Sequence, residues 1–185
     1  MLLPSDNVAG DSFGMSVASS KNNILAGAPG ALSDQGVAYI FQTSDRGFTW
    51  TQKQKLAPSD GAGDYEFGAF GSIFEDIAII GAPGKTYYTG AAYIFKSPDG
   101  GSTWPTTETA VLAASTPSTG DYFGSSTDVL KNFALVGAPA SSVVGSAFVF
   151  KTSDGGTSWA EQAELQAPGQ SSPNDFGQAV CLFEG

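Results

Sequence analysis

Carboxylates are the most numerous groups in this sequence that could take part in chemistry. The chain of 185 residues contains 18 aspartates and glutamates and no histidine, and Cys181 and Arg46 are its single cysteine and its single arginine. A Ser-His-Asp triad, a Cys-His pair and a zinc site built from histidine and cysteine are therefore excluded. Chemistry would have to come from a pair of carboxylates, as in a glycosidase, or from carboxylates that bind a cation.

The charge balance restricts the partners of the chain. Its formal net charge is -10 and its pI is about 4.1. Such a surface repels nucleic acid and anionic membranes, so a basic partner or a cation is the better expectation. No run of 18 apolar residues is present, which argues against membrane insertion, and the first residues lack the basic and apolar regions of a signal peptide.

Four short motifs recur along the chain, and they must position any functional group. Phe-Gly recurs at four positions spaced by 54, 56 and 53 residues, and Gly-Ala-Pro begins 14 residues after the phenylalanine in the first three units. A segment Gly-x-Ala-aromatic-Ile/Val-Phe follows, and then an Asp-x-Gly turn that closes on tryptophan. The Phe-Gly motifs begin at Phe13, Phe67, Phe123 and Phe176, and the Gly-Ala-Pro motifs begin at Gly27, Gly81 and Gly137.

Composition and repeats together predict an all-β fold. Only 14% of the residues are charged and 24 are glycine, which favours strands joined by tight turns. Four short antiparallel strands per unit are typical of one blade of a β-propeller, and the continuous apolar run 92–95 indicates a third strand buried on both faces. In the first unit the strands are expected near residues 15–18, 24–28, 37–42 and 49–56.

The ends of the chain do not complete a blade. Residues 2–6 match residues 56–60, the end of a fourth strand, and residues 176–183 match a leading strand. We therefore expect a single repeat domain, residues 1–185, with three full blades plus flanking strands. Three interpretations of these ends are open. The one we favour is a fragment of a larger propeller. The others are a ring completed between chains and an open array that self-associates through unpaired blade edges. The units would span about residues 2–55, 56–111 and 112–164, with a partial unit at 165–185.

The turns of each unit suggest structural roles. The hairpin turns Lys21-Asn22, Glu75-Asp76 and Lys131-Asn132 offer Asn or Asp where a positive φ is needed. In the Asp-x-Gly turns we expect each aspartate to accept hydrogen bonds from amides of its own turn, and each tryptophan to pack between blades. These residues are Asp45, Gly47 and Trp50, then Asp99, Gly101 and Trp104, and finally Asp154, Gly156 and Trp159.

The recurring Phe-Gly and Gly-Ala-Pro motifs resemble the FG-GAP repeats of integrin α-subunit propellers and of related secreted and surface proteins. The resemblance covers nearly the whole chain and implies a β-propeller. It also implies calcium, held in integrins by an Asp-rich loop between the two motifs. The corresponding residues 19–23, 73–77 and 129–133 are not rich in carboxylates, so the calcium loop of the family is absent here.

The tryptophan turns separately resemble the Asp-box, a hairpin motif of sialidases and other propellers. Sialidases bind the carboxylate of their substrate with three arginines, which Arg46 alone cannot supply. No acidic pair stands out from the repeat pattern, so we expect no enzymatic activity and assign the Asp-box an architectural role. A carboxylate-based glycosidase or lyase fragment remains an alternative.

A different acidic loop precedes each Phe-Gly motif. We prefer to interpret it as a solvated turn in which aspartate caps backbone amides, but glycine flanked by aspartate could also hold a cation such as Ca²⁺. Only the first two loops contain two aspartates. The metal candidates are therefore Asp6, Asp11, Asp60 and Asp64, and no cofactor is certain.

The function expected from the resemblance is that of a non-enzymatic binding or adhesion module of a secreted or cell-surface protein. Its partner would be a protein or a glycan, contacted through the loops of most variable sequence between Gly-Ala-Pro and the third strand, residues 31–35, 85–89 and 140–144. Tyr87 and Tyr88 are the candidate contacts, although the two rings could instead pack on their own loop. Besides the enzyme fragment, a structural repeat of a coat or filament is the other alternative.

Overall fold

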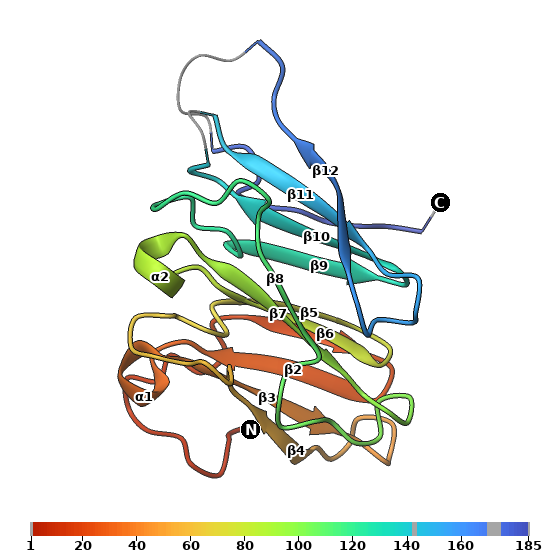
Figure 1. The fold of residues 1–185 in the computed structure, drawn as a ribbon. Helices are drawn as coiled ribbons and strands as arrows, with labels where there is room; N and C mark the ends of the chain where they lie inside the picture. Colours follow the sequence, from red (N-terminus) through yellow and green to blue (C-terminus); the bar gives the residue numbers. More distant parts are fainter. Residues whose placement is uncertain (1, 142–143, 170–174, 185) are drawn as a thin grey trace.

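Twelve strands form three separate four-stranded antiparallel sheets in the part of the chain that the structure describes (Figure 1). This structure is a computed structural model and describes residues 2–141, 144–169 and 175–184. It confirms the all-β prediction. The strands are β1 (Val17–Ser20), β2 (Asn23–Ala28), β3 (Val37–Gln42) and β4 (Thr51–Leu56), then β5 (Phe70–Phe74), β6 (Ile77–Ala82), β7 (Ala91–Lys96) and β8 (Ala110–Leu112), and finally β9 (Ser126–Leu130), β10 (Phe133–Ala138), β11 (Ser146–Lys151) and β12 (Ala160–Leu165).

Each sheet is one repeat unit, with its strands paired in chain order. We call the sheets blade 1 (β1–β4), blade 2 (β5–β8) and blade 3 (β9–β12). The blades stack face to face, and β5 of the middle blade lies beside both β1 and β9 (Figure 1). First strands therefore gather on one side of the stack, as the inner strands of propeller blades do.

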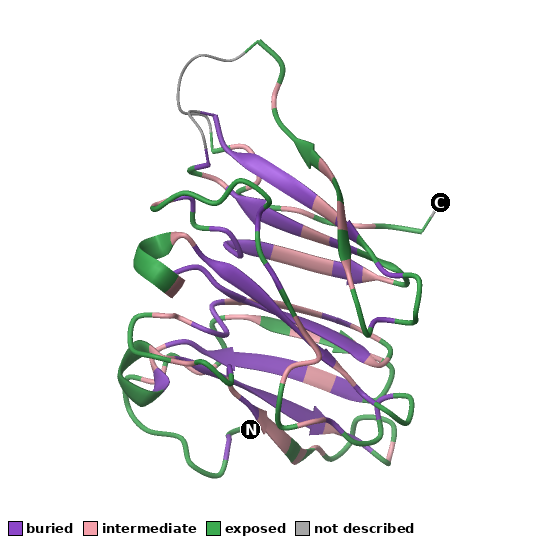
Figure 2. Cartoon of the chain, viewed as in Figure 1, coloured by how far each residue is buried: buried purple, intermediate pink, exposed green. Residues whose placement is uncertain are grey.

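The middle strands of the blades contain the core. Ala91, Ala92, Tyr93, Ile94 and Phe95 of β7 are each at most 2% exposed, which confirms that this strand is buried on both faces. One apolar cluster joins blades 1 and 2 and a second joins blades 2 and 3. Figure 2 shows the resulting buried band across the centre of the sheets.

The side of each blade that faces the next one is apolar in all three blades. In blade 1 it presents Leu25, Ile40 and Leu56, all buried under blade 2. At the equivalent positions of blade 2, Ile79, Ile94 and Leu112 are buried under blade 3. In blade 3, Leu165 is 43% exposed and Leu135 and Val149 are only half-buried. Burial at these positions thus depends on the neighbouring blade.

The two family motifs meet where consecutive blades touch. Within blade 2, Gly68 donates its amide to the carbonyl oxygen of Gly81 at 3.0 Å. Across the seam, a Cβ atom placed on Gly81 would lie only 2.0 Å from the carbonyl oxygen of Gly124, the glycine of the next Phe-Gly motif. The same approach recurs between Gly27 and Gly68 at 1.9 Å and between Gly137 and Gly177 at 1.9 Å. Glycine is therefore required by backbone contact, because no side chain fits.

The phenylalanines of Phe-Gly pack on the third strand of their own blade. Phe67 and Phe123 are at most 1% exposed, and the Phe67 ring meets the Tyr93 ring edge-on with centroids 5.4 Å apart. Phe13 makes the same type of contact with Tyr39 at 5.9 Å but is only half-buried. Phe67 and Phe123 also belong to the apolar clusters that join their blade to the preceding one.

Two details of the sequence-based prediction are wrong. In the hairpin turns the positive φ lies at Lys21, Glu75 and Lys131, the residue before the Asn or Asp. A two-residue turn with positive φ only at its first position is of the type II′ kind, so the second position has no need of Asn or Asp. The flanking segments 2–6 and 178–183 also form no strands, since neither has a ladder partner among the described residues.

The variable loops contain an unexpected left-handed turn. In α1 (Ala31–Asp34), Leu32, Ser33 and Asp34 have φ of 57°, 60° and 63°. In α2 (Lys85–Tyr88), Thr86, Tyr87 and Tyr88 have φ of 50°, 56° and 64°. Non-glycine residues in the left-handed region cost about 1–2 kcal/mol each.

No described helix has the length and apolar character needed to span a membrane.

These left-handed turns hold the next blade in place. The carbonyl oxygen of Asp34 accepts the amide of Glu66 at 2.9 Å, and that of Tyr88 accepts the amide of Tyr122 at 2.8 Å. Both donors directly precede a Phe-Gly motif. The unfavourable backbone of the turn is therefore offset by hydrogen bonds that fix the seam between blades.

The glycine contact between blades gives a stability prediction. Gly81→Ala should lower the free energy of unfolding by about 3 kcal/mol, the upper end of the range for overpacking, because the clashing atom is a backbone oxygen that cannot move aside. Urea unfolding followed by tryptophan fluorescence measures this difference.

Gly100→Ala is the matched control. Gly100 has a φ of 73° with no atom within 4 Å of an added Cβ, so only the backbone penalty of about 1–2 kcal/mol applies. Equal losses for the two variants would contradict the role assigned to the glycine contact.

Candidate functional site

Three sets of side chains proposed from the sequence are placed by the structure at the two ends of the blades. The tryptophan turns lie at the end where β3 leads to β4. The acidic loops and the variable loops lie at the opposite end, beside α1 and α2 (Figure 1). Each set is described in turn.

In each tryptophan turn the aspartate organises the backbone. Asp45 accepts the Thr49 amide at 2.8 Å through Oδ1 and the Thr49 hydroxyl at 2.6 Å through Oδ2. Asp99 does the same with Thr103, and Asp154 with Ser158. The carboxylates are thus occupied inside their own turns.

A hydroxyl two residues before each aspartate completes the turn. Thr43 Oγ1 donates to Asp45 Oδ1 and accepts the amide of Gly47 at 2.8 Å. Ser97 and Thr152 take this position in the other two turns. Sequence reasoning missed Thr43, although Ser97 and Thr152 stand at the same distance before the tryptophans of their own turns.

The hydrogen bonds lower the pKa of the turn aspartates. For Asp45 the Thr49 hydroxyl, the Thr49 amide and the Thr43 hydroxyl together hold the pKa at about 2, below its ordinary value of 3.8. The pKa values of Asp99 and Asp154 are lowered by the equivalent donors. A carboxylate with so low a pKa is a poor general acid near neutral pH.

The tryptophan turns of blades 2 and 3 touch the preceding blade. The carbonyl oxygen of Gly101 accepts hydrogen bonds from Asn23 Nδ2 and from Gln42 Nε2 of blade 1, both at 3.0 Å. Trp104 is 6% exposed and belongs to the cluster between blades 1 and 2, and Trp159 packs on the cluster between blades 2 and 3. Trp50 packs only within the cluster of blade 1, so the prediction of packing between blades is wrong for this tryptophan. The turns of blades 2 and 3 therefore act as clamps between neighbouring blades.

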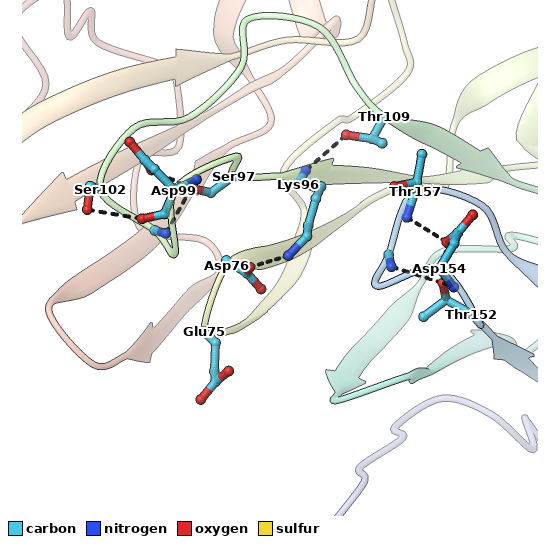
Figure 3. A network of polar contacts seen from close by, with 12 residues as sticks. Glu75, Asp76, Lys96, Ser97, Asp99, Ser102, Thr109, Thr152, Asp154 and Thr157 are labelled. Carbon is cyan, nitrogen blue, oxygen red and sulfur yellow. Dashed lines mark hydrogen bonds and ion pairs between the residues drawn. The ribbon is translucent and has the colours of Figure 1, made fainter.

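The residues beside the tryptophan turn at the seam between blades 2 and 3 differ from those at the seam between blades 1 and 2 (Figure 3). Ile77 and Lys96 stand where blade 1 has Asn23 and Gln42, and Lys96 pairs with Asp76 of its own blade. A cavity of about 420 Å³ lies there, with Asp76, Lys96, Asn132 and Ser153 in its lining. Lys96 and Asp76 neutralise each other, so neither of these two side chains offers an unpaired charge to a ligand in the cavity.

The acidic loops place two of their aspartates on buried tyrosines. Asp6 Oδ1 accepts the Tyr39 hydroxyl at 2.9 Å, and Asp60 Oδ1 accepts the Tyr93 hydroxyl at 2.7 Å. The remaining oxygens pair with lysines, Asp6 Oδ2 with Lys55 and Asp60 Oδ2 with Lys85, both at 2.6 Å. The cation beside these carboxylates is therefore an ammonium of the same chain.

These contacts shift the pKa values of all the acids involved. The hydrogen bond from Lys55 is the largest influence on Asp6 and lowers its pKa. For Asp60 burial acts upward, but the hydrogen bonds from Lys85 and Tyr93 outweigh it and lower the pKa. Burial, reinforced by the neighbouring aspartates, raises the pKa of Tyr39 and Tyr93 far above the ordinary range. These phenols stay protonated and do not act as bases.

The other two metal candidates take no part in these hydrogen bonds and ion pairs. Asp11 Oδ2 accepts the amide of Val8 at 2.8 Å, and the Asp64 backbone has a positive φ of 63° beside Gly84. In the ranges that the structure describes, no three His, Cys, Asp or Glu side chains gather as a metal ion would require. The geometry thus brings Asp6 and Asp60 to lysines and not to each other.

Tyr87 and Tyr88 lie on the left-handed turn of α2 and behave differently. Tyr87 is 82% exposed, whereas Tyr88 is 39% exposed and stacks on Tyr122 with ring centroids 5.0 Å apart and planes 33° from parallel. Tyr122 is itself 38% exposed. We call Tyr87, Tyr88 and Tyr122 the tyrosine surface. Part of the third variable loop, residues 142–143, lies outside the described residues.

Sequence reasoning missed Tyr122, Lys55 and Lys85. Tyr122 directly precedes the repeated Phe123-Gly124 motif, and this position beside a recurring motif is the signal that the sequence offers for it. In the structure, Phe67, Phe123 and Phe176 each bridge to a glycine of the preceding unit. The lysines had none, since Lys55 comes from β4 and Lys85 from α2 and only tertiary structure brings each to its aspartate.

The low pKa of Asp45 predicts a pH dependence. A carboxylate with a lowered folded-state pKa stabilises the fold above its unfolded pKa, and this contribution is lost as the pH falls through the folded value. Asp45→Asn should therefore lower the melting temperature at about pH 6, and the difference from wild type should shrink as the pH falls below about 4 and vanish only below the folded pKa of about 2. Thermal unfolding followed by circular dichroism at several pH values measures it.

Asp34→Asn serves as the control, because the Asp34 carboxylate accepts no hydrogen bond within the described ranges. A melting temperature of Asp45→Asn that equals that of wild type at about pH 6 would contradict the stabilising role of Asp45.

Comparison with known proteins agrees with the repeat geometry. A family model, the FG-GAP repeat, matches residues 1–41, 50–95 and 106–150. A search of curated proteins finds no match. Among solved structures, the crystal structure of the Saccharomyces cerevisiae Sqt1 is similar with a TM-score of 0.54 and 9% sequence identity. The likeness covers 90% of this chain and 37% of that chain, and at this identity it shows the fold alone.

The family match covers more than half of the chain, and it includes the Phe-Gly and Gly-Ala-Pro motifs that meet at the seams between blades. The chain belongs to the FG-GAP repeat family and is a β-propeller module.

Proposed function

We propose that this chain is a non-enzymatic binding module of a secreted or cell-surface protein and that it engages a protein or a glycan through the tyrosine surface. The observation that carries the proposal is the 82% exposure of Tyr87 beside the stacked pair of Tyr88 and Tyr122. Exposed tyrosines supply apolar area with a polar tip, and such residues dominate many recognition surfaces.

The backbone under these rings supports a binding role. Tyr87 and Tyr88 have positive φ and are held by hydrogen bonds, from the Tyr88 amide to Gly84 at 3.1 Å and from the Gly90 amide to Lys85 at 3.0 Å. Tyrosines presented on a fixed turn lose little conformational entropy when a partner binds. Strained backbone that persists on a surface is itself typical of ligand contacts.

A role without catalysis fits the chemistry of the carboxylates. The aspartates of the tryptophan turns, which resemble Asp-boxes, are occupied by their own turns, and Asp6 and Asp60 are paired with lysines. The absence of histidine from the sequence removes the commonest general base. We therefore assign the tryptophan turns an architectural role and expect binding without turnover. A secreted or surface location follows from the family resemblance.

The proposal is tested on defined arrays, one of glycans and one of purified ectodomains, with the full chain as the probe. Tyr87→Ala combined with Tyr122→Ala should weaken binding of any wild-type ligand at least about tenfold, because aromatic anchors at binding sites are commonly worth more than 1 kcal/mol. Surface plasmon resonance measures the affinity, and mass spectrometry of a bound glycan checks for cleavage.

Phe48→Ala provides the matched control. Phe48 is 88% exposed and lies in the first tryptophan turn, at the opposite end of the blade, so its loss should leave affinity unchanged. Ligands that bind the double tyrosine variant as tightly as wild type would overturn the assignment of the site, and cleavage of a glycan would overturn the non-enzymatic role.

A further inference from the structure

Blade 2 contains a ready-made receptor for an ammonium group, filled by its own Lys85. The Nζ atom donates to Asp60 Oδ2 at 2.6 Å and to the Tyr93 hydroxyl oxygen at 2.8 Å. It also lies 5.0 Å from the centre of the Tyr93 ring and 5.7 Å from that of Tyr65. A carboxylate, a phenol oxygen and two aromatic faces are together well suited to a primary ammonium.

Blade 1 repeats the Asp–Tyr pair of this receptor but not its loop lysine. Lys55 of β4 takes the Asp6 side of the pair, with Nζ 2.6 Å from Asp6 Oδ2 and 5.8 Å from the centre of the Tyr39 ring. By the repeat offset of 54 residues, Asp6 and Tyr39 stand where blade 2 has Asp60 and Tyr93, and the Tyr39 hydroxyl again donates to Asp6. Ala31, however, takes the place of Lys85, and Asp11 takes the place of Tyr65. The lysine of the loop is therefore replaced by a methyl group, and one aromatic wall is replaced by a second carboxylate.

A cavity of about 490 Å³ occupies this part of blade 1, beside the N-terminal loop and α1. Asp6, Asp11, Ala31, Ser33, Tyr39 and Lys55 are among the residues that line it. Val8 and Leu32 also line it and are 63% and 56% exposed, so the cavity borders the surface. Its volume is ample for the side chain that Ala31 lacks.

The charge in the cavity is not balanced. Lys55 reaches Asp6 Oδ2 from β4 and neutralises that carboxylate. Asp11 binds one backbone amide through Oδ2, and its Oδ1 accepts no hydrogen bond within the described part of the chain. Two carboxylates against one lysine leave one negative charge for a ligand, in a chain whose net charge is already -10.

We propose that the blade 1 cavity binds a primary ammonium group, namely a lysine side chain presented by a protein partner. The ammonium would donate to Asp11 and to the phenol oxygen of Tyr39, as Lys85 donates to that of Tyr93 in blade 2. This site goes beyond the tyrosine surface and shares no residue with it, so either assignment can fail without the other.

The test uses the full chain labelled with ¹⁵N and the probe Nα-acetyl-lysine-N-methylamide, followed by two-dimensional NMR. We expect saturable shifts of the Gly10, Asp11 and Ala31 amides. The same compound acetylated on Nε should give none, because it lacks the charge. Shifts that do not saturate, or equal shifts from both compounds, would overturn the proposal.

Two variants locate the ligand. Ala31→Lys should abolish the shifts, since it supplies the ammonium that blade 2 already contains. Asp11→Asn should weaken probe binding at least about tenfold, the equivalent of one charge-assisted hydrogen bond. Tyr87→Ala should bind the probe as wild type does. If Ala31→Lys does not fold, the Asp11→Asn variant decides: the proposed site is overturned if this variant binds the probe as tightly as wild type does.

A titration with Ca²⁺ separates the ammonium from a metal ion. The cavity contains two of the aspartates considered as metal ligands, Asp6 and Asp11. Because Lys55 already occupies Asp6, we expect no saturable shift of the Gly10 and Asp11 amides with Ca²⁺. Saturation by Ca²⁺ with no response to the lysine probe would replace the proposed site with a calcium site.

Discussion

The structure depends on one backbone contact that recurs at every seam. A glycine of Gly-Ala-Pro lies against the carbonyl oxygen of the next Phe-Gly glycine so closely that an added Cβ would come within about 2 Å of that oxygen. The Phe-Gly glycine is in turn hydrogen bonded to the Gly-Ala-Pro glycine of its own blade. The two motifs that define the family are therefore two halves of one joint, which explains their constant spacing.

Everything that packs between the blades follows from this joint. It brings the second strand of one blade against the Phe-Gly loop of the next, and Leu25, Ile40 and Leu56 of blade 1 are buried under blade 2. At the seam between blades 1 and 2, the left-handed turn secures one end through a backbone hydrogen bond, and the tryptophan turn secures the other through Gly101 and Trp104. At the same apolar positions of blade 3, Leu165 is exposed and Leu135 and Val149 are half-buried.

Because the blades repeat, equivalent positions of the three blades can be compared within one chain. Asp–Tyr pairs recur in blades 1 and 2 with a different lysine in each, and blade 3 has Phe148 at the tyrosine position. Of the four aspartates considered as metal ligands, Asp6 and Asp60 each pair with a lysine of the chain. The exposed tyrosines lie at the end of the blades away from the tryptophan turns.

The sequence by itself determined the blades, their strands and the tryptophan turns, because these depend on local spacing, on alternation and on turn residues that repeat three times. It also showed where function could lie, at Tyr87 and at the acidic loops. Only the tertiary structure decided which groups meet: Tyr122 with Tyr88, Lys55 with Asp6, and Lys85 with Asp60. These partners come from different loops and strands, and long-range contacts leave no periodic trace in a single sequence. The left-handed turns were hidden for the same reason, since hydrogen bonds to the next blade stabilise a backbone that local preference disfavours.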